Sequence, residues 1–162
     1  MINKPKYKRV LFVPDLHAPY HDKVAFKCML AFAKWWKPEV VFVLGDVVDM
    51  CQISKFEKDP DRLSRLQEDI DIAVGLLTEI GRACPDARKV FIPGNHEFRL
   101  RKFLWTEAAA LAGLRALQLP EVLELQKLGY EFMANGRLNF RGTIIKHGDI
   151  VRKFAGYTAK GE

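Results

Sequence analysis

The sequence predicts an α/β domain built on a mixed β-sheet, on the strength of three observations. Most of the chain alternates short apolar runs, rich in β-branched and aromatic residues, with longer stretches whose apolar residues recur at helical spacing. The part after residue 129 instead holds short segments separated by glycine-containing turns. With 162 residues, 49% of them apolar, the chain is expected to form one domain over residues 1–162 with a sizeable core.

The alternating part is predicted to contain buried strands and amphipathic helices. Three short apolar runs, each closed by a proline or a glycine, are predicted strands: residues 10–13, 40–44 and 90–92. Four segments are predicted helices: residues 22–36, 61–83, 98–112 and a short turn that begins at Pro120. Asp22 is the expected cap of the first helix, which Pro38 should end.

The end of the chain is predicted to form antiparallel strands. Short segments near residues 130–133, 137–140 and 143–147 are separated by Asn135-Gly136 and Arg141-Gly142. Asn-Gly is a strong signal for a β-hairpin, because both residues tolerate a positive φ. These strands would make the sheet mixed.

Composition narrows the class of protein. The net charge of +6 is spread along the chain, so no segment reads as a nucleic-acid-binding tail. The three cysteines have no metal-binding or redox spacing, which favours reduced thiols in a cytoplasmic protein. No apolar run is long enough to cross a membrane, so no membrane partner is expected.

Polar residues follow each predicted strand and offer metal ligands. Asp15, Asp46 and Asn95 come directly after the strands, and ligands of open α/β sheets bind beyond the carboxyl ends of strands. His17 lies two residues after Asp15, so in an extended segment both side chains would point the same way. His147 adds an imidazole from a later strand. Carboxylate, amide and imidazole ligands suit Mn, Fe, Zn or Ni, and two such ions can clamp a phosphoryl group.

Four blocks in this order resemble the calcineurin-like metallophosphoesterase family: Asp15-x-His17, Gly45-Asp46-x-x-Asp49, Gly94-Asn95-His96-Glu97 and His147-Gly148-Asp149. The resemblance extends from residue 9 to the end of the chain. Its closing run, residues 147–159, is most similar to bacteriophage and bacterial members. The resemblance implies a sandwich of two mixed β-sheets flanked by helices, and the cytoplasm of a bacterium or an infected host.

The resemblance also implies a metal site with two divalent ions. Asp15 and His17 would hold the first ion, Asp46 would bridge both, and Asn95 and His147 would hold the second. The expected activity is hydrolysis of phosphomonoesters or phosphodiesters by attack of a metal-bound hydroxide on phosphorus.

Further roles follow from the same resemblance. His96 would be the catalytic residue that assists the leaving oxygen. Asp49 and Glu97 would orient the imidazoles that bind metal. Arg99 is a candidate phosphate-binding residue, because its guanidinium offers a fork of donors.

One block of the family is missing from this sequence. Family members carry a Gly-His-x-His block near the end, yet no histidine follows His147. We therefore expect an incomplete domain that lacks its last strands, and a fragment is the favoured explanation. A second chain that supplies the missing ligands is another, which leaves the oligomeric state open. Two other functions remain: a non-catalytic binding module of this fold, and a nuclease that acts on DNA or RNA.

Overall fold

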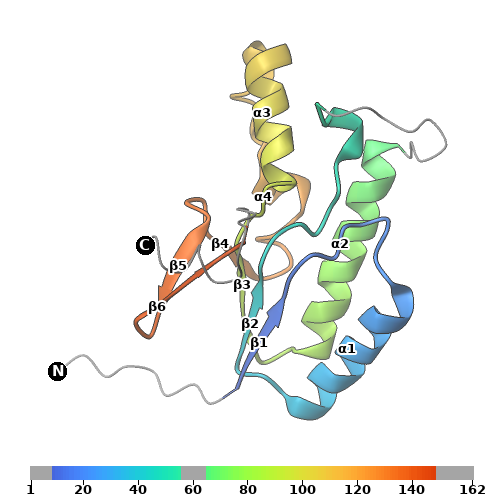
Figure 1. The fold of residues 1–162 in the computed structure, drawn as a ribbon, viewed down its shortest axis with the longest axis vertical. Coiled ribbons are helices and arrows are strands. Elements are labelled where there is room, and N and C mark those ends of the chain that lie inside the picture. The colour runs from blue at the N-terminus through green and yellow to red at the C-terminus, as the bar shows by residue number, and fades with distance from the viewer. Residues whose placement is uncertain (1–8, 56–64, 149–162) are drawn as a thin grey trace, which may run out of the picture.

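A computed structural model describes residues 9–55 and 65–148 (Figure 1). Strands and helices alternate through its larger part, as predicted. In chain order the strands and α-helices are β1 (Val10–Val13), α1 (Lys23–Trp36), β2 (Val40–Val43), α2 (Leu66–Ala83), β3 (Arg88–Phe91), α3 (Glu97–Glu107), α4 (Leu119–Val122), β4 (Tyr130–Phe132), β5 (Arg137–Phe140) and β6 (Thr143–Lys146). Within the described residues, three 3₁₀ turns lie between them: η1 (Cys51–Ile53), η3 (Ala109–Leu111) and η4 (Arg115–Leu117). No helix in these ranges is both long and apolar enough to span a bilayer.

The main sheet is parallel, which corrects the predicted mixed sheet. Its four strands have the order β1-β2-β3-β4, and each neighbouring pair is parallel. The expectation of an antiparallel strand near residue 130 is therefore wrong. The chain between β3 and β4 returns through α3 and α4, so β4 enters the sheet in the same direction as β3. Tyr130 anchors β4 there by donating a buried hydrogen bond to the carbonyl of Leu77 in α2, at 2.9 Å.

The hairpin lies one turn later than Asn-Gly predicts. β5 and β6 pair antiparallel in a separate two-stranded sheet, with Phe140 opposite Thr143. The two residues of its turn, Arg141 and Gly142, both have positive φ, 56° and 87°, as in a type I′ turn. Asn135-Gly136 instead connects β4 to β5, which belong to different sheets.

The two faces of the main sheet are covered by different elements. In Figure 1, α1 and α2 lie on one side of the sheet and the β5–β6 hairpin on the other. Val41 and Val43 of β2 join the core formed with the helices, whereas Val40 and Phe42 join a second cluster with the hairpin. The Phe42 and Phe140 rings meet edge to face, with centroids 5.1 Å apart. This double cover explains why β2 is apolar throughout.

The helices begin and end close to their predicted bounds, with one exception. Residues 61–64 of the second predicted helix lie outside the described residues, and α2 is seen from Leu66. The exception is α3, which ends at Glu107 rather than at residue 112. Ala108 leaves helical geometry at φ −146° and ψ 49°, and Ala108 and Ala112 then pack back onto the core. This packing outweighs the helix propensity of the alanine run.

Replacing the helix cap Asp22 by alanine should lower the melting temperature modestly at neutral pH. The Asp22 carboxylate accepts hydrogen bonds from the backbone N–H groups of Val24 and Ala25, at 2.8 and 2.9 Å. The bond from Ala25, and to a smaller extent that from Val24, lowers the pKa of Asp22 below its ordinary value of 3.8. A depressed pKa means that the cap stabilises the fold above pH 3.8 and loses this effect as pH falls through the folded-state pKa.

Thermal unfolding followed by circular dichroism checks this prediction. The difference between wild type and Asp22→Ala should be present at pH 7 and should shrink in acid. Asp22→Asn is the control, because asparagine also caps helices but does not ionise. A difference in melting temperature between wild type and Asp22→Ala that persists unchanged through the acid range would contradict the prediction.

Candidate metal centre

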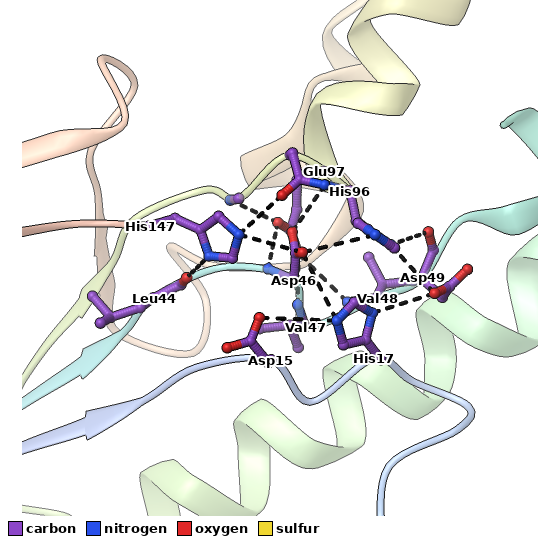
Figure 2. A network of polar contacts seen from close by, with 12 residues as sticks. Asp15, His17, Leu44, Asp46, Val47, Val48, Asp49, His96, Glu97 and His147 are labelled. Atoms are coloured by element: carbon purple, nitrogen blue, oxygen red, sulfur yellow. Dashed lines mark hydrogen bonds and ion pairs between the residues drawn. The ribbon is translucent and has the colours of Figure 1, made fainter. Parts of the chain in front are cut away.

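The loops after β1, β2 and β3 meet at one edge of the parallel sheet, as expected for the carboxyl ends of its strands. Backbone hydrogen bonds hold the first two loops together: His17 N–H donates to the carbonyl of Asp46 at 2.8 Å, and Ala18 N–H to that of Val47 at 2.7 Å. Most candidate residues predicted from the sequence lie on these loops, Glu97 and Arg99 lie in the first turn of α3, and His147 joins them from the end of β6 (Figure 2).

Asp46 lies at the centre of the cluster. Its Oδ2 is 3.3 Å from Nε2 of His147 and 3.8 Å from Nε2 of both His17 and His96. Its Oδ1 accepts a hydrogen bond from the backbone N–H of His96 at 2.9 Å. Asp46 is only 3% exposed. A buried carboxylate with three imidazoles around one oxygen needs positive charge nearby, which a metal ion would supply.

The backbone at the candidate ligands has an unusual conformation. Seven non-glycine residues in the described ranges have positive φ, and three of them are Asp15, His17 and Asp46, at 56°, 50° and 50°. This corrects the expectation that Asp15 and His17 lie in an extended segment. Left-handed non-glycine residues are energetically costly and gather at functional sites. The strained backbone still brings Asp15 Oδ1 to 3.9 Å from Nε2 of His17.

Two glycines allow the β2 and β3 loops to touch. Gly45 has φ 74°, and a Cβ there would lie 2.1 Å from the backbone nitrogen of Gly94. A Cβ on Gly94 would lie 2.2 Å from Oδ1 of Asp46. Any side chain at either position would therefore push Asp46 out of the cluster.

Asp49 contacts two imidazoles in the structure. Its Oδ2 lies 3.2 Å from Nδ1 of His17 and 3.3 Å from Nδ1 of His96. The Asp49 carbonyl also lies 2.9 Å from Nδ1 of His96. These contacts favour the Nδ1–H tautomer of both rings, which directs each Nε2 toward Asp46.

His147 is oriented by a backbone acceptor that has no sequence signal. Its Nδ1 donates to the carbonyl of Leu44 at 2.6 Å, which leaves the Nε2 lone pair free to bind a metal. That Nε2 is 3.0 Å from Oδ1 of Asn95. Asn95 and His147 therefore lie together, although they are far apart in the sequence.

Glu97 does not contact an imidazole in the structure, contrary to the expected role. Its carboxylate is 2% exposed and accepts hydrogen bonds at 2.8 Å from the backbone N–H groups of Asp46, Val47 and Gly94. Glu97 thus ties the β2 loop to the β3 loop. Burial raises the pKa of Glu97, and these hydrogen bonds oppose that rise.

Arg99 lies beside His96 rather than out in solvent. Its NH1 donates to the Asp49 carbonyl at 2.8 Å, and its NH2 lies 2.9 Å from Nε2 of His96. The pKa of His96 is lowered, chiefly by burial and further by the Arg99 charge, while Asp46 and Asp49 oppose this. The structure therefore favours a neutral His96 with its Nε2 facing Arg99 and Asp46.

The described residues include clustered donor atoms that could hold a metal ion. Two sets of three donors lie within 4.8 Å of one another: His17, Asp46 and His96, and Asp15, Asp46 and His147. Oxygen and imidazole nitrogen donors suit Mn, Fe, Zn and Ni. Asp46 belongs to both sets, as a bridging ligand would. His17 Nε2 also lies 3.9 Å from Oδ1 of Asp15, so the pairing of Asp15 with His17 implied by resemblance stays a prediction.

Comparison with known proteins identifies the family of this chain. A family model described as calcineurin-like phosphoesterase matches residues 8–156, which is most of the chain. Searches of curated proteins and of solved structures returned no match. The residues matched by the model include every strand and helix of the described fold and all candidate ligands. The chain belongs to the calcineurin-like phosphoesterase family.

Proposed function

We propose that this protein hydrolyses phosphoric esters, with two divalent metal ions held by Asp15, His17, Asp46, Asn95 and His147. The observation that carries the proposal is the place of Asp46, whose carboxylate is common to both sets of donor atoms. When bound, such ions supply positive charge that draws electrons from the phosphoryl oxygens and lower the pKa of water.

Side chains of the protein would bind the phosphoryl group and assist the leaving oxygen. His96 and Arg99 lie on the same side of Asp46, with 2.9 Å between the Arg99 guanidinium and Nε2 of His96. An ester oxygen placed beside them would accept a hydrogen bond from Arg99, and one from His96 once Nε2 of that ring has taken up a proton. Arg99 would hold the phosphoryl group through its fork of donors, and His96 would assist the leaving oxygen. Asp49 keeps both His17 and His96 in place for these roles.

Metal titration and ester hydrolysis test the proposal together. Mn²⁺ is titrated by calorimetry into protein freed of metal with EDTA, and the same samples are assayed with p-nitrophenyl phosphate and bis(p-nitrophenyl) phosphate. We expect saturable Mn²⁺ binding and turnover that depends on it. Absence of Mn²⁺ binding would overturn the proposal, and binding without turnover of any phosphate ester would identify a non-catalytic module instead.

The role of His96 has a separate test. His96→Asn should lower turnover by about 10²–10⁴-fold, as expected for the loss of a general acid, with Mn²⁺ affinity unchanged. His21→Asn is the matched control, because His21 belongs to neither set of donor atoms. A loss of Mn²⁺ affinity in His96→Asn would show that His96 is a ligand, as its grouping with His17 and Asp46 allows, and would contradict the catalytic role.

A further inference from the structure

A groove leads away from the metal centre along α3. It has a volume of about 1050 Å³ and is bounded by α3 on one side and by η1 and the residues that follow it on the other. Asn95 and Arg99 line its inner end, so the groove is continuous with the candidate metal centre. In Figure 1, α3 projects beyond the sheet and the α1–α2 layer, which leaves much of its surface open.

Most exposed residues of α3 line this groove. Arg99, Lys102 and Thr106 recur every three or four residues and so lie in a row along the helix, and Asn95 precedes them in the turn before α3. Leu100 and Leu104 point the other way, into the core. At about 1.5 Å per residue, the row from Arg99 to Thr106 extends roughly 10 Å from the metal centre.

The groove carries positive charge. Its described lining includes four basic residues and one acidic residue, Glu107, which lies at the far end of α3. The basic residues are Lys55, Arg99, Arg101 and Lys102. The ratio of basic to acidic residues is therefore higher in the groove than in the whole chain. Such a groove favours an extended anion over a compact neutral ligand.

Aromatic rings lie among these charges. Phe98, Phe103 and Trp105 line the groove and are 41%, 37% and 59% exposed. The Arg101 guanidinium lies 4.4 Å from the centroid of the Trp105 ring. Exposed aromatic faces among cations are the features with which proteins bind single-stranded nucleic acids, because bases stack on the rings while phosphates meet the charges.

We infer that this α3 groove binds a single-stranded nucleic acid and that the esters cleaved at the metal centre are phosphodiesters of that strand. The inference rests on the proposed phosphoesterase function. A polynucleotide carries both the bases that would stack on Trp105 and the phosphate that would enter the adjoining site. A duplex fits less well, because its bases are already stacked and paired. An acidic peptide matches the charge but offers no phosphoric ester to the site.

Binding is tested without turnover, by fluorescence anisotropy of a labelled 12-nucleotide single strand with EDTA-treated protein. We expect saturable binding that weakens with salt, as phosphate contacts require. Trp105→Ala should weaken it by about tenfold, the loss of one stacked base. Lys102→Ala should also weaken binding and lower the salt slope by roughly one. Trp35→Ala is the matched control, because Trp35 is 76% exposed but lies in α1, away from the groove.

The outcomes separate this inference from the proposed function. Failure to bind the strand, or binding that Trp105→Ala and Lys102→Ala leave unchanged, would overturn the inference even if p-nitrophenyl esters are hydrolysed. Equal weakening by Trp35→Ala would also overturn it. Conversely, strand binding that depends on Trp105 with no hydrolysis of any ester would leave the groove assigned and the phosphoesterase function rejected. Heparin has no bases, so heparin binding that Trp105→Ala weakens as much as it weakens strand binding would contradict the stacking role of Trp105.

Discussion

Replacing Asp46 by alanine is expected to remove Mn²⁺ binding and to reduce turnover of phosphate esters by about 10³-fold or more. The carboxylate is the only group shared by both sets of donor atoms, so its loss weakens both sites at once. Metal ions supply several kcal/mol of stabilisation to a phosphoryl transition state, and each 1.36 kcal/mol corresponds to a factor of ten in rate. Calorimetry and the two p-nitrophenyl assays measure the two effects in the same samples.

Asp46→Asn separates charge from structure. Asp46 Oδ1 also accepts the backbone N–H of His96, so alanine removes a structural hydrogen bond as well as a ligand. Asparagine keeps an acceptor of the same size at that point but loses the negative charge. We expect Asp46→Asn to melt close to the wild type and still to lose most Mn²⁺ affinity. Wild-type affinity in either folded variant would contradict the central place of Asp46.

The position of the site was predictable because it depends on local sequence and on one rule of sheet topology. Asp15, Asp46 and Asn95 follow apolar runs that are recognisable as strands, and parallel strands place their carboxyl ends at one edge. Gly45 and Gly94 directly precede Asp46 and Asn95. The structure shows why both positions are glycine, since neither has room for a Cβ. His147 arrives from a more distant element, and only its motif indicated that it would join them.

The pairing of β4 and the backbone conformation of the loop after β1 were not predictable in the same way. β4 has three residues, too few to show a periodicity that separates a parallel strand from an antiparallel one. Its partner is decided by the return path of the chain and by the bond from Tyr130 to α2. The positive φ of Asp15 and His17 was also not predictable, because it depends on the contacts of the β1 loop with the β2 loop.

The role of Glu97 shows how a correct motif can be misinterpreted. Resemblance to the family led to the expectation that Glu97 orients an imidazole that binds metal. The Glu97 carboxylate is instead buried and accepts hydrogen bonds from the backbone of the β2 and β3 loops. There it binds the backbone that carries Asp46, which makes it a determinant of stability and of loop geometry at the same time.

Replacing Glu97 by alanine should therefore cause the largest loss of stability of any change considered. It leaves the N–H groups of Asp46, Val47 and Gly94 buried without their acceptor. Each such group costs about 1–3 kcal/mol, so the sum is comparable with the roughly 5–15 kcal/mol that holds a typical domain folded. We expect Glu97→Ala to be largely unfolded at 37 °C, or to melt far below the wild type.

Urea denaturation at pH 7 measures this loss, with Glu107→Ala as the control on the same helix. Glu107 is exposed, and its removal should shift the midpoint little. Glu97→Gln should fall between the two, because its one carbonyl oxygen can accept some of these bonds while its amide group faces a backbone donor. Equal midpoints for Glu97→Ala and Glu107→Ala would show that the loops are held without this carboxylate. If Glu97→Gln folds but binds Mn²⁺ weakly, the result would show that Glu97 positions Asp46 for metal binding. Glu97 is hydrogen-bonded to the backbone of Asp46, which is the contact through which such an effect would reach the metal cluster.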